Sequence, residues 1–253
     1  MLFRSLAQID QQIAEGSDTN IVLAQSRDGS LRLVDLHLDS PDGTVVIDEA
    51  TATILPGERV LVTGEAGAGS TTLFRAIAGL WPWGKGRIER PAAEIMFVPQ
   101  RPYLPHGTLR EALAFPRVGT AFDDAALTRA LDRCELGALA RRLDEVGQWD
   151  RILSESEQQK LSFARILLHR PAWVFMDQAT SALSEEEQAA VMSLFESDLP
   201  QTSLVSAGFR SGLPKFHHRG LSLVRSPASG GTRLEQVRIA PRGATRPPAA
   251  WGR

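Results

Sequence analysis

Short apolar runs of the length of buried strands recur along the chain, and each is closed by glycine or a polar residue. A run of four to eight apolar residues with such ends predicts a strand buried on both faces, as in a parallel sheet. The run that ends at Asp177 closes on a carboxylate, and the run that ends at Gln100 closes on an amide. The pattern predicts buried strands over residues 59–63, 95–100, 172–177 and 202–205.

Alternating apolar and polar positions mark a second kind of strand. They occur at 21–24 and 31–38 and are followed, after a Ser-Pro-Asp-Gly turn, by an apolar segment at 44–47. We expect these segments to be antiparallel strands joined by a hairpin. A closing hairpin is expected between 221–225 and 234–239.

Apolar residues recur at helical spacing between the buried strands predicted at 95–100 and 172–177. Residues 109 to about 168 are predicted to be helical with breaks, and 73–79 form a short apolar helix directly after the first buried strand. Residues 184–187 form a capping box that opens a further helix. The order of elements predicts an α/β fold with an α-helical lobe inserted at about 101–170.

Both ends of the chain differ from this pattern. Four apolar residues at helical spacing predict an amphipathic helix over 1–15: Leu2, Leu6, Ile9 and Ile13. The C-terminal end holds three arginines, three prolines and no acid, which is typical of a disordered tail. We therefore expect an N-terminal helix and linker at 1–28, one folded domain at 29–240 and a basic tail at 241–253.

Composition narrows the classes of protein. A net charge of −2 over 253 residues argues against a nucleic-acid partner. The single cysteine, Cys134, excludes an internal disulfide and fits a reducing compartment. No stretch of about 18 apolar residues predicts a transmembrane helix, and the N-terminus lacks the apolar run of a signal peptide, so a soluble chain is expected.

A glycine-rich loop follows the first buried strand and opens the first apolar helix. Its sequence, Gly64-Glu-Ala-Gly-Ala-Gly-Ser-Thr-Thr72, has the glycine spacing of a phosphate-binding P-loop, whose backbone N–H groups converge on an anion at a helix N-terminus. Ser70 stands where the motif has lysine, and Thr71 stands at the magnesium position. Taken alone, the loop is equally compatible with a glycine-rich turn that binds no ligand.

Further motifs in a fixed order make the chain resemble the nucleotide-binding domain of an ABC transporter. It looks most like the half-transporter subfamily that includes bacterial peptide and vitamin B12 importers and peroxisomal acyl-CoA transporters. The resemblance runs from about 30 to about 225 and rests, beside the P-loop, on residues 73–82, 97–105, 107–110, 153–159, 161–165, 168–171 and 177–183.

The resemblance implies a P-loop NTPase fold, with a RecA-like core, an antiparallel β subdomain and the inserted helical lobe. It also implies ATP and Mg²⁺ as ligands, and a second ABC nucleotide-binding domain and a transmembrane permease domain or subunit as partners. A cytoplasmic position at the inner (plasma) membrane, held through the membrane-spanning partner, follows from the same likeness.

Site residues are carried over from the family's motifs position by position. Magnesium is expected at Thr71, Gln100 and Asp177. The catalytic positions are Gln100 and Gln178, which act on the attacking water, and Phe209, which stands at the position of the histidine that contacts the terminal phosphate. The signature segment, 153–159, faces the nucleotide of a partner domain in this family. The nucleotide-binding positions are Gly64, Glu65, Ala66, Gly67, Ala68, Gly69, Ser70, Thr71, Thr72, Ser154 and Ser156.

Several of these positions depart from the family's pattern. Ser70 offers a neutral hydrogen bond in place of an ammonium, a loss of about 1.5–3 kcal/mol of nucleotide binding. Gln178 replaces the general base glutamate, and an amide cannot accept a proton, which removes a factor of about 10²–10⁴ in rate. Phe209 replaces the switch histidine.

Further departures from the family's motifs occur in the signature segment and after the buried strand at 172–177. Ser156 replaces a glycine that allows close phosphate approach, and Glu155 adds a negative charge beside it. Ser184 replaces the dimer-contacting aspartate. His217 and His218 lie too far along the chain to replace the switch histidine and are expected to be exposed loop residues.

Charged and proton-transferring groups are thus changed while the apolar framework is intact. The pattern favours an ABC-type domain with impaired or absent hydrolysis, a pseudo-ATPase that keeps the fold and is expected to bind nucleotide weakly. Two other interpretations are an active ATP-hydrolysing subunit that powers transport and a soluble interaction module that no longer binds nucleotide.

Overall fold

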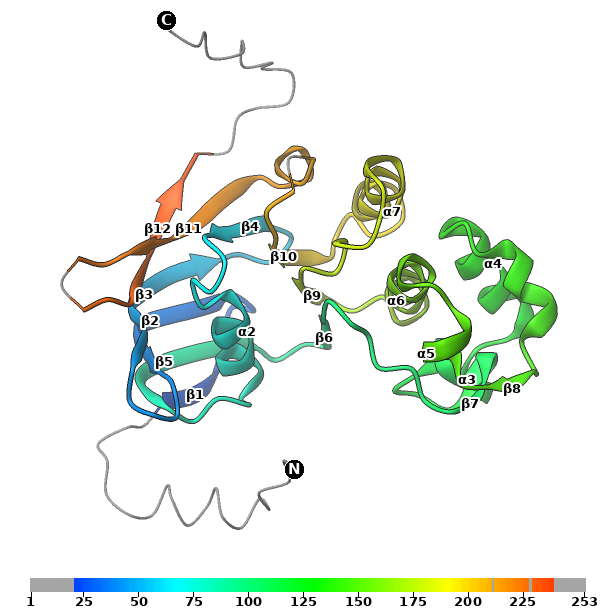
Figure 1. The fold of residues 1–253 in the computed structure, drawn as a ribbon, viewed down its shortest axis with the longest axis horizontal. Coiled ribbons are helices and arrows are strands. Elements are labelled where there is room, and N and C mark those ends of the chain that lie inside the picture. Colours follow the sequence, from blue (N-terminus) through cyan, green and yellow to red (C-terminus); the bar gives the residue numbers. More distant parts are fainter. Residues whose placement is uncertain (1–20, 211, 228, 239–253) are drawn as a thin grey trace, which may run out of the picture.

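The computed structural model describes residues 21–210, 212–227 and 229–238 (Figure 1). The helix expected at 1–15 and the tail expected at 241–253 lie outside these residues. Ten strands form one sheet. They are β1 (Ile21–Ser26), β2 (Leu31–Asp39), β3 (Val45–Ile54), β4 (Arg59–Gly64), β5 (Gly84–Pro91), β6 (Ile95–Val98), β9 (Trp173–Asp177), β10 (Ser203–Ala207), β11 (Arg219–Arg225) and β12 (Thr232–Val237). Their order across the sheet is β1-β5-β2-β3-β12-β11-β4-β10-β9-β6.

The predicted buried strands form the parallel half of this sheet, since β4, β10, β9 and β6 are parallel neighbours. Alternate side chains enter two separate cores. Val60 and Phe175 pack with helix α2 (Ser70–Ala78) on one face. Leu61 and Val174 pack on the other face with helices α6 (Glu155–His169) and α7 (Glu185–Ser197). Helices on both faces explain why these strands are apolar throughout.

The antiparallel part corrects one expectation. β2 pairs with β3 in antiparallel fashion as predicted, and so do β11 and β12. β1, however, pairs in parallel with β5, and β5 lies between β1 and β2. The sequence did not predict β5, because the strand shows no alternating pattern. Its one large apolar side chain is the fully buried Ile88, and its other positions are mostly glycine or charged.

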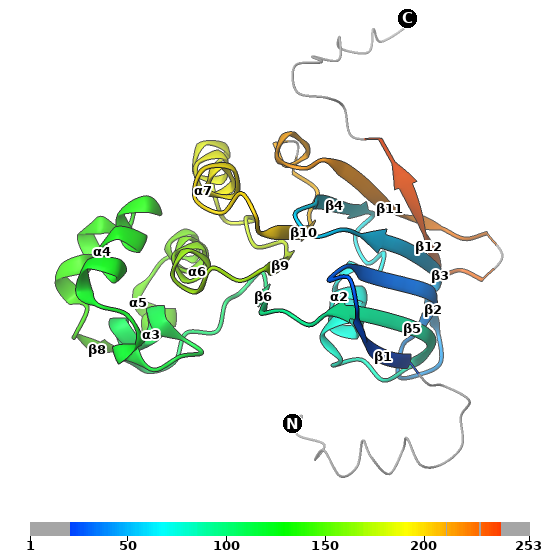
Figure 2. The ribbon, with the colours of Figure 1, turned by 180° about the vertical axis from the view of Figure 1, so that it is seen from behind.

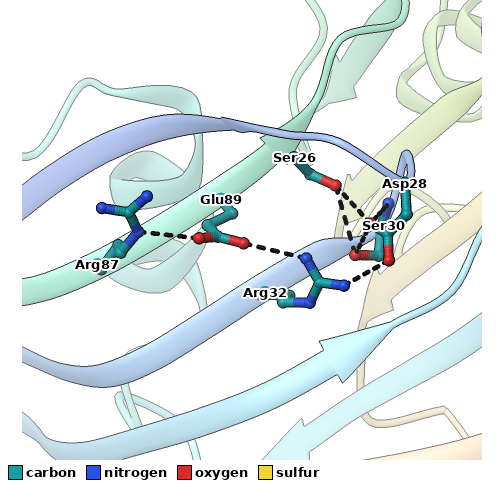
Figure 3. Close-up of polar contacts among 6 residues, drawn as sticks. All are labelled: Ser26, Asp28, Ser30, Arg32, Arg87 and Glu89. Atoms are coloured by element: carbon teal, nitrogen blue, oxygen red, sulfur yellow. Dashed lines mark hydrogen bonds and ion pairs between the residues drawn. The ribbon is translucent and has the colours of Figure 1, made fainter.

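A row of polar contacts ties these outer strands together (Figure 3). Glu89 of β5 accepts hydrogen bonds from Arg87 at 2.9 Å and from Arg32 of β2 at 3.1 Å. Arg32 continues the row to Asp28 in the turn after β1. Asp28 also accepts from the hydroxyl groups flanking that turn, which hold the pKa of its carboxyl well below the usual range. These contacts account for a tight turn between β1 and β2.

The inserted helical lobe lies at the opposite end of the molecule from β1 (Figures 1 and 2). Its core contains Leu113, Leu127 and Trp149, each fully buried. The Trp149 indole donates a 3.0 Å hydrogen bond to the carbonyl of Gly107. Besides α6, the lobe contains β7 (Gly107–Thr108), α3 (Leu109–Ala114), η1 (Gly119–Ala121), α4 (Asp124–Arg133), η2 (Gly137–Arg142), β8 (Val146–Gly147) and α5 (Trp149–Ile152), and η3 (Pro214–Phe216) precedes β11 in the sheet-bearing part.

No helix within the described residues is both long and apolar enough to cross a membrane.

Candidate functional site

The glycine-rich loop connects the carboxyl end of β4 to the N-terminus of α2, as the sequence predicted. Gly67 and Gly69 have φ angles of 80° and 100°, which favour glycine. A Cβ atom on Gly69 would also lie 2.8 Å from Cγ1 of Val46. The loop can therefore follow this path only with glycine at that position.

Helix α2 presents its N-terminal amide groups without a competing side chain. Helices α3, α4, α6 and α7 each begin with a side chain that accepts from the first turn. Among the described residues of α2, the N-cap is Gly69, no side chain caps the turn, and no acid stands within it. Free N–H groups and the positive end of the helix dipole favour an anion here.

Charge is the weak feature of this anion site. Ser70 is the first residue of α2 and brings no cation to the loop. Glu65, the loop's one ionisable residue, is exposed and forms a 3.2 Å ion pair with Arg225 at the end of β11. The loop itself thus carries a negative charge where a polyphosphate would lie.

Thr71 and Asp177 meet at the junction of α2 and β9. The Thr71 hydroxyl donates a 2.5 Å hydrogen bond to Oδ2 of Asp177. Oδ1 of Asp177 is buried and has no hydrogen-bond partner among the described residues. A hydroxyl and an unsatisfied carboxylate oxygen are donors of the type that Mg²⁺ prefers, so these two residues fit a magnesium ion.

Among the described residues, Gln100 forms no hydrogen bond with Thr71 or Asp177. Its amide donates a 3.2 Å hydrogen bond to the Ser181 hydroxyl in the segment after β9. Gln159 of α6 fastens both segments, because its Nε2 donates to the Gln100 carbonyl at 2.9 Å and its Oε1 accepts from the amide of Ala182 at 2.9 Å. The side-chain hydrogen bond of Gln100 in this structure is thus to Ser181.

Gln178 follows Asp177 in a left-handed backbone conformation, with φ of 51°. The backbone N–H of Gln178 donates a 2.9 Å hydrogen bond to the carbonyl of Ala207, which fixes the turn against the end of β10. Phe209 follows the end of β10 by two residues, and 55% of its surface is exposed. Both positions lie at the carboxyl edge of the sheet, close in the fold to the loop after β4.

The expectation for His217 is wrong, whereas His218 is exposed as expected. His217 is buried, its Nδ1 donates to the Leu213 carbonyl at 2.8 Å, and its Nε2 accepts from the Ser206 hydroxyl at 2.9 Å. Burial lowers the pKa of His217 to about 4. The side chain closes the loop after β10 against the core and cannot reach a ligand, because both ring nitrogens are used.

The signature segment begins helix α6. Ser154 is its N-cap and forms a capping box with Glu157. Glu155 is exposed and lies 3.7 Å from Arg101. The hydroxyl of Ser156 donates a 3.1 Å hydrogen bond to Glu187 of α7, within its own chain. That Ser156 crowds a phosphate held by a partner domain stays a prediction.

Glu187 joins the signature segment to the N-terminus of α7. Its carboxylate accepts a 2.8 Å hydrogen bond from the backbone N–H of the N-cap residue Ser184. It also forms a 2.8 Å ion pair with the buried Lys160. These bonds lower the pKa of Glu187 to about 2. The sequence showed the capping box of α7 but carried no signal for its bond to Ser156, since the two residues are 31 positions apart.

An apolar groove of about 540 Å³ opens between the sheet and the helical lobe. Its walls include Phe74 of α2, Phe97 of β6 and Tyr103, and Tyr103 is 64% exposed. Arg165 of α6 lines the same groove; it is buried, and its Nη2 has no hydrogen-bond partner among the described residues. Sequence patterns did not reveal this groove, because its residues come from four separate elements.

Comparison with known proteins agrees with this geometry. A family model described as ABC transporter matches residues 47–181. An uncharacterized ABC transporter ATP-binding protein of Haemophilus influenzae is 39% identical over 188 residues, which cover 74% of this chain and 32% of that protein. The lysosomal cobalamin transporter ABCD4 of Homo sapiens is 33% identical over 241 residues, which cover 89% of this chain and 37% of that protein. The chain thus spans about a third of the length of the curated relatives it matches.

A solved structure supports the fold. The structure of a bacterial Atm1-family ABC exporter with ATP bound aligns with a TM-score of 0.73 and 20% sequence identity, over 92% of this chain and 43% of that chain. At this identity the likeness concerns the fold alone. It agrees with a P-loop NTPase fold for the α/β core and its inserted helices.

Proposed function

The chain belongs to the ABC transporter family, as an ATP-binding domain of it, and we propose that this domain hydrolyses ATP poorly or not at all. The observation that carries the proposal is Gln178, which follows the metal-binding candidate Asp177 directly. In the family this position holds the glutamate that accepts a proton from the attacking water. The amide of Gln178 can orient water but cannot accept that proton.

Nucleotide binding is proposed to persist in weakened form. The amides at the start of α2 would hold the phosphates, and Thr71 and Asp177 would hold Mg²⁺, which neutralises part of the phosphate charge when bound. Ser154 would contact a nucleotide held by a second domain. Because Ser70 supplies no charge, affinity should be lower by about ten- to a hundredfold than with lysine at that position.

The other replaced positions act in the same direction. Phe209 has no hydrogen bond to give to a terminal phosphate, and the amide of Gln100 is hydrogen-bonded to Ser181 at 3.2 Å. The sequence led us to expect a domain at 29–240 with the helical lobe at about 101–170; because β1 (Ile21–Ser26) belongs to the sheet, we propose that the domain begins no later than residue 21. Retention of a complete apolar core around altered polar positions favours a folded subunit with a non-hydrolytic role.

The proposed partners are a transmembrane domain or subunit and a second nucleotide-binding domain. The apolar groove supports the first, because Leu80, Phe97 and Tyr103 leave 73%, 37% and 64% of their surfaces exposed there. An apolar segment of a membrane-spanning partner would cover them and could offer an acceptor to Arg165. Through such a partner the domain would lie at the cytoplasmic side of the inner membrane.

Two measurements on the purified chain test the proposal: equilibrium titration with Mg-ATP, and phosphate release at saturating ATP. We expect weak binding that Ser70→Lys tightens by about ten- to a hundredfold, together with negligible turnover. Turnover at the rate of an active transporter subunit would instead support the alternative of an active ATP-hydrolysing subunit that powers transport. An absence of binding in both the natural chain and the Ser70→Lys variant would favour an interaction module.

A further inference from the structure

A polyphosphate bound at the glycine-rich loop would lack its usual cation. Residues 64–72 contain no lysine or arginine, and Glu65 adds a negative charge. Any compensating charge must therefore come from another element. Such a cation would act on a bound nucleotide, so the inference that follows rests on the proposed nucleotide binding.

Three arginines in other elements contact residues outside the glycine-rich loop. Arg210 donates to the carbonyl of Thr180 at 2.8 Å and also to that of Leu183. Arg75 of α2 lines the apolar groove and has no hydrogen bond or ion pair to the loop among the described residues. Arg101 lies against Glu155 of the signature segment. None of these three contacts the glycine-rich loop among the described interactions.

Arg225 is placed differently. Strand β11 runs parallel to β4, with Leu223 opposite Gly64, so Arg225 projects beyond the carboxyl edge where the loop begins. Side chains two residues apart share one face of a strand. Leu221 and Leu223 are buried in the core that includes the α2 residue Leu73, so Arg225 emerges on the face that α2 and its loop cover.

Contacts confirm the proximity of Arg225 to the loop. Its Nε lies 3.2 Å from Oε2 of Glu65, and the two side chains are 71% and 77% exposed. Arg225 also lines a cavity of about 220 Å³ together with Gly67 and Ala68 of the loop. The Thr232 hydroxyl donates a 2.8 Å hydrogen bond to the Ala68 carbonyl, which fixes the loop as one wall of this cavity.

We propose that Arg225 is a phosphate-binding residue of this domain, which exchanges its ion pair with Glu65 for the polyphosphate of a bound nucleotide. The exchange is favourable because an exposed ion pair contributes little stability, so breaking it costs little. A polyphosphate carries more negative charge than one carboxylate and offers arginine a bidentate contact. Arg225 thus partly replaces the lysine that Ser70 lacks.

Substitution of Arg225 tests the assignment directly. With Mg-ATP and with inorganic tripolyphosphate as probes, Arg225→Ala should weaken binding about five- to thirtyfold, and Arg225→Lys should lose much less. Glu65→Gln should tighten binding, because it removes a competing carboxylate. Arg233→Ala is the matched control: this arginine is half exposed on the adjacent strand, pairs with Asp48 at 3.4 Å and does not line the cavity.

A double-mutant cycle sharpens the test. In a Ser70→Lys background the effect of Arg225→Ala should fall to about twofold or less, because the restored ammonium takes over the charge. Equal affinities of the natural chain and Arg225→Ala, with Ser70→Lys still tightening binding, would overturn this inference and leave the proposed function standing. A natural chain that binds neither probe would overturn both.

Discussion

The Thr71 hydroxyl donates a 2.5 Å hydrogen bond to Oδ2 of Asp177, across 106 positions of sequence. This contact joins the start of α2, where the glycine-rich loop ends, to the end of β9, which Gln178 follows directly. It leaves the buried Oδ1 of Asp177 without a hydrogen-bond partner in the described part of the chain. A buried, unpaired carboxylate oxygen costs stability unless a ligand satisfies it. The relationship supports the proposal that a cation binds between Thr71 and Asp177.

Asp177→Asn tests that role. The substitution keeps the shape and an oxygen acceptor for Thr71, while it removes the charge. We expect the Mg²⁺-dependent part of ATP binding to fall about 10- to 100-fold, with little change in EDTA. Without ligand, the Asp177→Asn variant should be as stable as the natural chain or more so, as measured by its thermal midpoint.

The control is Asp198→Asn, which alters a surface ion pair with Arg133. Equal Mg²⁺ dependence in the natural chain and Asp177→Asn would contradict the assignment.

Ser156 is expected to contribute to the stability of its own chain, through the 3.1 Å bond to Glu187. Ser156→Ala should lower the free energy of unfolding by about 1 kcal/mol. Ser156→Gly should lower it by up to about 1 kcal/mol more, because glycine is a poor helix former. Urea unfolding of the three proteins measures both steps. No loss in the alanine variant would mean that the hydroxyl faces away from Glu187.

His217 predicts a pH dependence of stability. Its pKa is about 4 in the folded chain against an ordinary value of 6.5, because burial disfavours the charged ring, with Arg59 and His218 nearby adding to the effect. The unfolded chain binds the proton more readily, so the contribution of His217 is fully present above pH 6.5 and is lost as the pH falls toward 4. Between pH 7.5 and 5 the loss is about 2 kcal/mol.

Urea unfolding of His217→Gln at several pH values checks this expectation. The variant should be less stable than the natural chain at pH 7.5, and its stability should fall less steeply toward pH 5. His106→Gln serves as the control, because His106 is exposed and lies in the helical lobe. Parallel pH curves for the natural chain and His217→Gln would show that the ring is not buried in neutral form.

The domain is predicted to form no ATP-driven homodimer. In this family two domains enclose ATP between the P-loop of one and the signature segment of the other. A homodimer of this chain would place Ser70 and Ser156 in both sites. Static light scattering should give the same mass with and without Mg-ATP. The matched comparison is Ser70→Lys, in which any gain of dimer assigns the defect to phosphate binding. An ATP-dependent dimer of the natural chain would contradict the prediction.

The sequence predicted the parallel core well, because its strands are continuous apolar runs closed by recognisable residues such as Asp177. It also placed the glycine-rich loop correctly between a strand and a helix. It missed β5, since a strand rich in glycine and charge with one buried Ile88 has no visible period. It then paired β1 with the wrong neighbour.

Side-chain partners were beyond the reach of the sequence. The bond of Ser156 to Glu187, the burial of His217 and the approach of Arg225 to Glu65 each join residues whose proximity depends on the finished fold. Motif positions identify which residue type stands at a site. They do not show which partner its side chain contacts: Ser156 bonds to Glu187 of its own chain, and Gln100 bonds to Ser181.

Steady-state phosphate release tests the central claim of impaired hydrolysis most directly. The natural chain, Gln178→Glu alone, and the fourfold variant Ser70→Lys, Ser156→Gly, Gln178→Glu and Phe209→His would be compared at saturating Mg-ATP. Groups that act on one transition state are not additive, so the single change should recover little and the fourfold variant should recover turnover. Substantial turnover in the natural chain, or in Gln178→Glu alone, would contradict the account.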